Sequence, residues 1–481
     1  MSYIQSVGFS WRHASRTQPA IDRLDVRIER GERVLLVGPS GSGKSTLLAA
    51  LAGVLDHAER GEASGLLTIA GDAPAARRHP VGLLRQDPET SVVLGRVGDE
   101  VRFGCENLGV PVDETNRRAR DALETVGLRV DENHSTASLS GGQKQRLALA
   151  ALLAMQPELW LLDEPTAQLD PVGAVAVREA LSRALRPDDT VLVVEHHAAE
   201  WWSVISRVIA LNAHGQLVVD ATPEQAVTEH RATLEALGVW LPNTQMPSLA
   251  LQANERHMLL APENLGVGRG MGRGAAVATF DQPIASGDAL VLRGANGSGK
   301  STIALTLGGL LRPLSGSVHA NRDWAPRSRR GVSISAPDRW NSQQLAARIA
   351  SVFQQPDLQF VRHTVRDELH LGARSAEAAD ALLDELGLAA LAAAHPRSLS
   401  GGEKRRLSVA TALASRAELI IADEPTFGQD ANSWLALTAQ LAAARDAGRA
   451  LVLPSHDERL APRLSAAELM VTGLTTAGGL A

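Results

Sequence analysis

The sequence of 481 residues predicts an α/β protein made of two similar domains, each with a mainly parallel sheet at its core. Two observations carry this prediction. Several segments of the first half return in the second half about 260 residues later. Within each half, short apolar runs alternate with segments that have a helical pattern. Strands that are apolar throughout are typical of a parallel sheet covered by helices on both faces.

The repeated segments keep their order along the chain. GPSGSGKST at 38–46 returns as GANGSGKST at 294–302, LSGGQKQR at 139–146 as LSGGEKRR at 399–406, and LLDEPTAQLD at 161–170 as IADEPTFGQD at 421–430. A repeat this long indicates duplicated domains, because the units of solenoid proteins are only about 20–50 residues long. We expect a first domain at 1–242, a second at 256–481, and a short polar linker at 243–255.

The first domain is expected to contain a buried strand at 33–38, RVLLVG, which ends at a glycine. A helix is predicted at 45–55, because its apolar residues fall on one stripe. Further apolar runs predict strands at 159–164 and 190–196, and the second domain offers corresponding runs at 289–294, 419–424 and 450–456.

The composition excludes several classes of protein. With 44% hydrophobic and 21% charged residues, the chain has the balance of a folded globular protein. A net charge of −6 gives no general attraction to nucleic acid, so no nucleic-acid partner is expected. The apolar run at 147–155 is far shorter than the roughly 20 residues of a membrane helix. The first ten residues lack a secretory pattern and Cys105 is the only cysteine, so we expect a cytosolic location.

Lysine is rare in this chain. Of 48 basic residues only four are lysine, and they are Lys44, Lys144, Lys300 and Lys404. Each lies in one of the repeated segments, two in GSGKST and two directly after SGGQ or SGGE. Lysine is a compact point charge whereas arginine is a broad planar fork, so a narrow phosphate-binding loop distinguishes the two.

The two GxxxxGK[ST] segments predict phosphate binding. Their glycines let the backbone N–H groups point inward, and the helix that follows presents its positive end. In this pattern the lysine reaches the β and γ phosphates and the serine hydroxyl ligates Mg²⁺. Each domain also has an apolar strand that ends in two acids, Asp163-Glu164 and Asp423-Glu424. In phosphate-loop nucleotidases the first acid holds Mg²⁺, and the second is placed to act as a general base toward water.

With the LSGGQ and LSGGE segments added, nearly the whole chain resembles the ATP-binding cassette (ABC) ATPases. The resemblance implies two fused P-loop NTPase domains, each with a helical subdomain that carries the signature segment. It also implies that the two domains pair within one chain around two ATP molecules. The loop that follows the acidic strand, with Asp170 and Asp430, would lie at that interface. Both sites retain a glutamate and a histidine, so both are expected to hydrolyse ATP.

The resemblance implies the following sites. The first would comprise Gly38, Pro39, Ser40, Gly41, Ser42, Gly43, Lys44, Ser45 and Thr46, with Gln86, Asp163, Glu164 and His196, closed by Ser400, Gly401, Gly402 and Glu403. The second would comprise Gly294, Ala295, Asn296, Gly297, Ser298, Gly299, Lys300, Ser301 and Thr302, with Gln354, Asp423, Glu424 and His456, closed by Ser140, Gly141, Gly142 and Gln143. Expected Mg²⁺ ligands are Ser45, Gln86 and Asp163 in one site and Ser301, Gln354 and Asp423 in the other. Expected catalytic residues are Glu164, Glu424, His196, His456, Gln86 and Gln354.

Two residue assignments leave alternatives open. His197 adjoins His196, and only the repeat offset of 260 favours His196, because the same offset separates the acids. Family members usually stack adenine on an aromatic residue near the start of the domain, which is Trp11 here. The second copy has no aromatic residue at 259–274, so its ATP affinity is expected to be lower unless Val267 covers the base.

The segments after Gln86 and Gln354 resemble the energy-coupling-factor importers of cobalt and vitamins, although Arg85 and GRVGDE depart from the usual pattern. This resemblance implies an ATPase on the cytoplasmic face of the membrane. Its partners would be an integral-membrane scaffold, seated beside the two glutamines, and a small substrate-binding membrane protein. Two alternatives remain, a sugar-type importer ATPase and a soluble ribosome-associated twin cassette. An insertion at 321–340, basic and with Trp324 and Trp340, is expected to be a solvated loop, with contact to RNA or lipid headgroups as the alternative.

Overall fold

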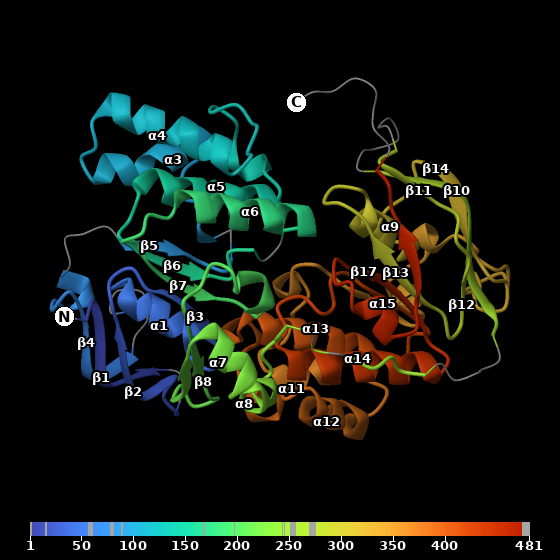
Figure 1. Ribbon diagram of the computed structural model, residues 1–481. Helices are drawn as coiled ribbons and strands as arrows, with labels where there is room; N and C mark the ends of the chain where they lie inside the picture. The colour runs from blue at the N-terminus through green and yellow to red at the C-terminus, as the bar shows by residue number, and fades with distance from the viewer. Residues whose placement is uncertain are drawn as a thin grey trace. The chain divides into compact units, whose positions relative to one another are not determined.

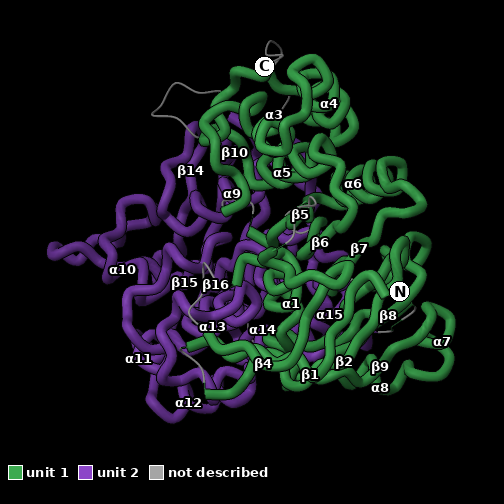
Figure 2. The backbone as a smooth tube through the Cα atoms, turned by 90° about the vertical axis from the view of Figure 1, so that its left-hand side faces the viewer, with its two compact units in different colours: residues 1–244 green, residues 245–481 purple. Residues whose placement is uncertain are grey.

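The computed structural model describes residues 2–14, 17–55, 61–76, 81–87, 90–166, 169–196, 198–242, 244, 246–250, 256–268 and 276–473. The chain divides into two compact units, 1–244 and 245–481 (Figure 2). The second unit holds residues that composition had assigned to a linker. Leu249 N donates to Arg463 O at 2.8 Å, and Arg445 Nη2 donates to Ala250 O at 3.0 Å. A polar composition gave no sign of these main-chain bonds.

The core of the first unit is a six-stranded sheet in the order β5-β6-β7-β3-β8-β9. Its strands are β5 (Val81–Leu84), β6 (Leu159–Asp163), β7 (Thr190–Val194), β3 (Arg33–Val37), β8 (Arg207–Leu211) and β9 (Leu217–Ala221). All neighbours are parallel except β8 and β9. A second, smaller sheet is antiparallel and contains β2 (Ile21–Ile28), β1 (Ile4–His13) and β4 (Gly61–Ile69).

The second unit repeats this plan with a five-stranded sheet that is parallel throughout, β15-β16-β17-β13-β18. The strands are β15 (Ile349–Val352), β16 (Leu419–Ala422), β17 (Ala450–Pro454), β13 (Ala289–Arg293) and β18 (Ala467–Met470). Its antiparallel sheet contains β10 (Met258–Val267), β11 (Ala278–Phe280), β12 (Ile284–Ala285) and β14 (Ser315–Ala320). The predicted α/β class with parallel cores is confirmed.

Helices cover the parallel sheets, and Figure 1 shows α5 and α6 between the sheet and the α3–α4 pair in the first unit. The first unit has α1 (Lys44–Leu51), α3 (Val97–Asn107), α4 (Val112–Thr125), α5 (Gly141–Met155), α6 (Pro171–Ala184), α7 (Pro223–Thr228) and α8 (Arg231–Ala236). The second has α9 (Lys300–Leu307), α10 (Ser342–Ala346), α11 (Val365–His370), α12 (Ala376–Glu385), α13 (Gly401–Ala414), α14 (Ala431–Asp446) and α15 (Leu460–Arg463). None of the helices in the described ranges combines the length and apolarity needed to span a bilayer.

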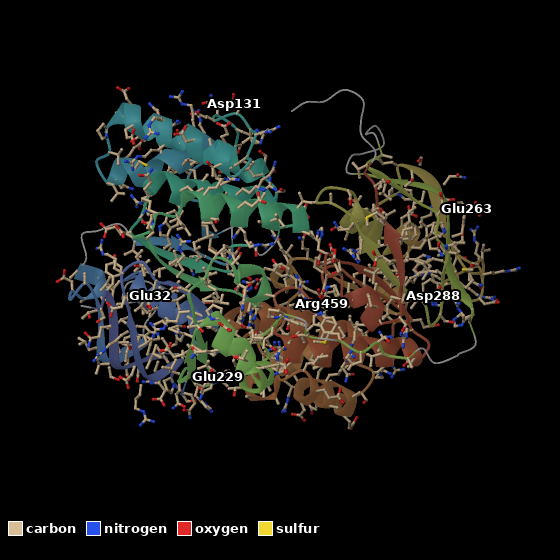
Figure 3. All side chains as sticks on the ribbon, viewed as in Figure 1. Glu32, Asp131, Glu229, Glu263, Asp288 and Arg459 are labelled. Carbon is tan, nitrogen blue, oxygen red and sulfur yellow. The ribbon has the colours of Figure 1, made fainter. Side chains whose placement is uncertain are left out.

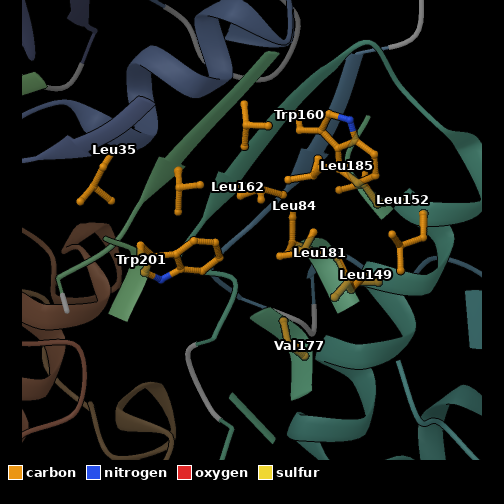
Figure 4. Packing of buried hydrophobic residues seen from close by; sticks show 14 of the residues in the cluster. Leu35, Leu84, Leu149, Leu152, Trp160, Leu162, Val177, Leu181, Leu185 and Trp201 are labelled. Carbon is orange, nitrogen blue, oxygen red and sulfur yellow. The ribbon is translucent and has the colours of Figure 1, made fainter. Parts of the chain in front are cut away.

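Alternate residues of the central strands point to opposite faces of the sheet, and both faces are buried. On β6, Trp160 and Leu162 join the cluster drawn in Figure 4. Leu159 and Leu161 of the same strand join a second cluster with residues of α1. This burial on both faces explains why the predicted strands are apolar at every position.

Two local expectations need correction. The helix predicted at 45–55 ends at Leu51, because Gly53 takes a left-handed φ of 71° that closes the helix. The tryptophans of the insertion are core residues, since Trp324 and Trp340 are buried with ring centroids 5.5 Å apart. The Trp340 indole donates to Ile334 O at 2.6 Å. Neither ring is therefore available to stack on a nucleic-acid base, while the neighbouring arginines remain exposed.

Candidate nucleotide sites

Each phosphate loop joins a central strand to a short helix, β3 to α1 and β13 to α9. Glycine is required at the end of each strand. Gly38 and Gly294 have φ values of 149° and 148°, and an added Cβ would lie within 2.4 Å of Leu211 O or 2.3 Å of Val471 O. The loops therefore run against a neighbouring strand end, where no side chain has room.

The loop lysines are buried and turn back over their own loops. Lys44 Nζ donates to Gly38 O and Pro39 O, both at 2.8 Å. Lys300 Nζ donates to Gly294 O at 2.7 Å and Ala295 O at 3.0 Å. Both ammonium groups lie inside the loop, in reach of the place where backbone N–H groups would bind phosphate.

The serine and the first acid of each site are in contact. The Ser45 hydroxyl hydrogen-bonds the Asp163 carboxyl, and Ser301 does the same to Asp423. Burial, then the nearby Glu164, raises the pKa of Asp163 to about 6. One buried oxygen of Asp163, Oδ1, has no hydrogen-bond partner in the described part of the chain. A buried carboxylate oxygen without a partner, next to a serine hydroxyl, fits a hard cation such as Mg²⁺.

The second acid of each pair has a strained backbone. Glu164 and Glu424 take φ values of 49° and 51°, in the left-handed region that residues with side chains rarely adopt. Their amides hold this turn by donating to Val194 O at 2.9 Å and Pro454 O at 2.8 Å on the adjacent strand. Strain of this kind concentrates at functional sites.

In the first copy the glutamate is paired. Glu164 Oε1 lies 3.2 Å from His196 Nε2, and Gln86 Nε2 donates to Glu164 Oε2 at 2.8 Å. Burial opposes ionisation of Glu164, but the histidine and the glutamine outweigh it and hold its pKa below the usual value. The structure thus brings together Gln86, Glu164 and His196 as the sequence predicted, while His197 lies outside the described residues.

In the second copy the corresponding histidine has other partners. His456 Nε2 is 3.0 Å from Asn296 Oδ1 and 3.2 Å from Lys300 Nζ, and 3.8 Å from Glu424 Oε1. Burial and the neighbouring Asp423 raise the pKa of Glu424 to about 7. The two sites therefore share residue types, but the pKa of the glutamate is shifted in opposite directions.

Each copy also anchors the threonine that follows its acids, a contact that the motifs did not indicate. Thr166 Oγ1 donates to Glu195 at 2.6 Å, and Thr426 Oγ1 donates to Asp457 at 3.1 Å. Glu195 precedes His196, whereas Asp457 follows His456. Burial raises the pKa of Glu195 to about 8.

The acid of the second copy stays charged. Burial opposes ionisation of Asp457, but the adjacent Arg459, labelled in Figure 3, outweighs it and keeps its pKa below the usual value. Arg459 Nε donates to Asp457 Oδ1 at 2.8 Å, and the Trp434 indole donates to Oδ2 at 2.6 Å. This difference is visible in the sequence. The acid precedes the histidine in VEHH at 194–197 and follows it in PSHD at 454–457.

The signature serines begin helices. Ser140 caps α5 and Ser400 caps α13, each within a capping box. In each box the serine N–H donates to the side-chain oxygen of Gln143 or of Glu403. Each helix begins at the first glycine of SGG, so its first turn offers backbone N–H groups to an anion. Asp170 and Asp430 cap α6 and α14, where their carboxylates accept a bond from the N–H of Gly173 and of Ser433.

Trp11 does not have the position that adenine stacking requires. Its side chain is only 2% exposed and belongs to the apolar cluster around β1 and α1. A Cβ on Gly61, across the sheet on β4, would lie 2.4 Å from the indole. Val267, the candidate in the second copy, is also buried. His13 contacts the end of the phosphate-loop motif, with Nε2 3.3 Å from Thr46 Oγ1.

Comparison with known proteins gives the family. The model described as "ABC transporter" matches residues 21–167 and 279–427, which is more than half of the chain. The chain belongs to the ABC transporter family. This ABC ATPase therefore has two P-loop NTPase domains, hydrolyses ATP, and uses ATP with Mg²⁺.

Similar proteins span almost the whole ATPase. One is the "Putative HMP/thiamine import ATP-binding protein YkoD" of Bacillus subtilis, 32% identical, with 99% of this chain and 91% of the relative covered. Another, a Streptomyces coelicolor protein named as an ABC transporter ATP-binding protein, is 31% identical over 93% of this chain and 88% of its own. Among solved structures, an archaeal ribosome recycling factor, ABCE1, covers 97% of this chain and 89% of its own with a TM-score of 0.64. At 20% identity that likeness shows the fold alone.

Proposed function

We propose that this ABC ATPase is the energy-coupling subunit of an importer that takes up a micronutrient, a vitamin or a transition-metal ion, through membrane partners. The observation that carries the proposal is an exposed apolar rim that follows the glutamine of both sites. It consists of Val93 in the first copy and Leu358 and Val361 in the second. Apolar side chains this exposed in the corresponding segment of both copies fit a surface that another protein covers.

One residue of the rim in the second copy, Leu358, lines a cavity that also includes residues of the proposed nucleotide site. This cavity of about 370 Å³ is also lined by Gln354, Ser301 and Asp423. A partner helix seated there would contact the same loop that carries a proposed Mg²⁺ ligand. Docking and nucleotide state would be coupled through Gln354.

The site residues suit an in-line hydrolysis. In the proposal, the loop N–H groups with Lys44 or Lys300 bind the phosphates, and Ser45, Gln86 and Asp163, or Ser301, Gln354 and Asp423, hold Mg²⁺. Bound Mg²⁺ would neutralise charge on the phosphate oxygens. Glu164 and Glu424 would take the proton from the attacking water, and His196 and His456 would orient that water. The helix starts at Ser140 and Ser400 would offer backbone N–H groups to a nucleotide phosphate.

The proposed partners are an integral-membrane scaffold and a small substrate-binding membrane protein, and the proposed location is the cytoplasmic face of the membrane. The name of the Bacillus subtilis relative, an import ATP-binding protein, supports this choice. A sugar-type importer remains an alternative. A ribosome-associated role rests only on a likeness of fold.

The experiment is affinity purification of the chain from detergent-solubilised membranes, with mass spectrometry of the co-purifying proteins. We expect a scaffold with several membrane helices and a second small hydrophobic protein. Ribosomal proteins in their place would overturn the proposal. Val361→Glu should reduce the yield of the scaffold by about tenfold or more, the effect of losing one well-buried interface residue.

A matched control is available in the same unit. Val332 is exposed to a similar extent, 65% against 68% for Val361, but belongs to the insertion and not to the segment that follows Gln354. Val332→Glu should leave the yield of the scaffold unchanged. An equal loss with both variants would show that general surface polarity, and not the rim, controls the association.

A further inference from the structure

The two copies connect their glutamine segment to their acidic strand in different ways. In the first copy the connection is a side-chain bond, from Gln86 to Glu164 at 2.8 Å. Within the described residues, the Gln354 side chain makes no such bond to Glu424. The second copy uses instead Arg405, a residue of the signature helix α13 that no motif assigns to the site.

Arg405 joins three segments of the second unit. It is only 3% exposed, and its Nη1 donates to Phe353 O at 2.7 Å and to Asp423 O at 3.1 Å. Its Nη2 donates to Gln354 O. Phe353 and Gln354 directly follow β15, and Asp423 directly follows β16. One guanidinium thus binds the main chain of Gln354 and of Asp423. These are the two proposed Mg²⁺ ligands of this copy that lie outside the phosphate loop.

The first copy has a glutamine at the equivalent position. Gln145 is equally buried, and its Nε2 donates to Pro165 O at 3.1 Å. An amide has one nitrogen with two N–H donors, whereas a guanidinium has five in a fixed fork. In the described residues, Gln145 therefore reaches the loop after the acids but makes no bond to the Gln86 segment.

We propose that Arg405 is a positioning residue of the second nucleotide site, where it fixes the spacing of Gln354 and Asp423 and leaves the Gln354 amide available to the metal. Partners that orient metal ligands are worth about 10- to 100-fold in metal affinity. The guanidinium is suited to this role because it is rigid, always charged and able to bind several carbonyls at once. The inference concerns the ATPase site and holds whichever membrane partner the chain has.

The test measures metal binding directly. In full-length chain with Lys44→Ala, so that only the second site binds nucleotide, Mn²⁺ serves as the probe in the presence of ATP, and electron paramagnetic resonance gives the bound fraction. Arg405→Gln, which places the residue of the first copy in the second, should raise the Mn²⁺ concentration at half saturation by about tenfold or more. An unchanged half-saturation value in a folded variant would overturn the proposal.

Arg449 supplies the matched control. It is also buried and also binds carbonyls, with Nε donating to Ala417 O at 2.7 Å and Nη1 to Leu413 O at 2.8 Å, at the opposite end of α13. Arg449→Gln should lower the melting temperature and leave Mn²⁺ affinity unchanged. An equal loss of affinity with Arg449→Gln would show that Arg405 acts only through stability, and overturn the proposal.

A second variant covers the case in which Arg405→Gln fails to fold. Arg405→Lys keeps a buried cation, but a single ammonium cannot reach carbonyls on both strand ends in the same geometry. It should raise the half-saturation value in the same direction. A folded Arg405→Lys variant with the parent affinity would contradict the role of the fork.

Discussion

His196 Nε2 lies 3.2 Å from the Glu164 carboxylate, whereas the equivalent atom of His456 lies 3.8 Å from Glu424 and contacts Asn296 and Lys300. The pairing lowers the pKa of Glu164, although burial opposes this, and burial together with Asp423 raises that of Glu424 to about 7. Two sites with the same motif residues thus contain bases whose pKa values are shifted in opposite directions.

This difference predicts separate pH profiles for the two sites. A carboxyl with a raised pKa is protonated below that value and cannot accept a proton. Turnover of Glu164→Gln, which leaves only the second site, should therefore fall as the pH drops through about 7. Turnover of Glu424→Gln, which leaves only the first, should persist to lower pH. Superimposable profiles for the two variants would contradict the assigned protonation states.

Glu195 predicts a pH dependence of stability. Its pKa rises from 4.5 to about 8 on folding, mainly because it is buried. Between these values the unfolded chain loses the proton while the folded chain keeps it, so stability declines as the pH rises. Glu195→Gln keeps an acceptor for Thr166 and removes the titration. The melting temperature of this variant should decline less between pH 5 and 8 than that of the parent, and Glu179→Gln, an exposed control, should follow the parent.

Lys44→Arg should impair ATP binding although it preserves the charge. Lys44 is buried and its ammonium fits between two carbonyls at 2.8 Å, where a guanidinium is too broad. Lys404 is the control, because its partner is the Asp357 carboxylate at 3.0 Å, which also accepts an arginine. Nucleotide titration should show weaker binding for Lys44→Arg and parent affinity for Lys404→Arg. Equal affinities in both variants would refute the steric argument.

Trp11→Ala should act on stability more than on nucleotide binding. Removing a buried tryptophan typically costs about 3–5 kcal/mol, and Trp11 packs inside the cluster around β1. Thermal unfolding should show a clear loss, while the preference for ATP over GTP stays close to that of the parent. An unchanged melting temperature together with a lost preference for ATP would contradict this prediction and indicate that the ring contacts adenine.

The sequence was sufficient for the parallel sheets and the phosphate loops, because both follow local rules. Runs that are apolar at every position, such as LWLLD, become strands buried on both faces. Gly38 and Gly294 sit where a side chain would collide with a neighbouring strand end. These constraints act over a few residues and leave a clear pattern.

What the sequence did not reveal depends on contacts between distant segments. Trp11 is buried because Gly61 on a neighbouring strand makes room for its ring, and nothing near Trp11 in the sequence indicates this. Glu195 and Asp457 hold equivalent threonines from opposite sides of a histidine. Arg405 occupies the position of Gln145 in a similar motif, and only the fold shows which carbonyls its guanidinium reaches.

The most direct test of the catalytic assignment is ATP turnover of the chain with Glu164→Gln and Glu424→Gln combined. Loss of a general base typically lowers turnover by about 10²–10⁴-fold. Each single variant should keep part of the activity, and the double variant should lose nearly all of it while still binding ATP with parent affinity. Hydrolysis at the parent rate by the folded double variant would contradict the account.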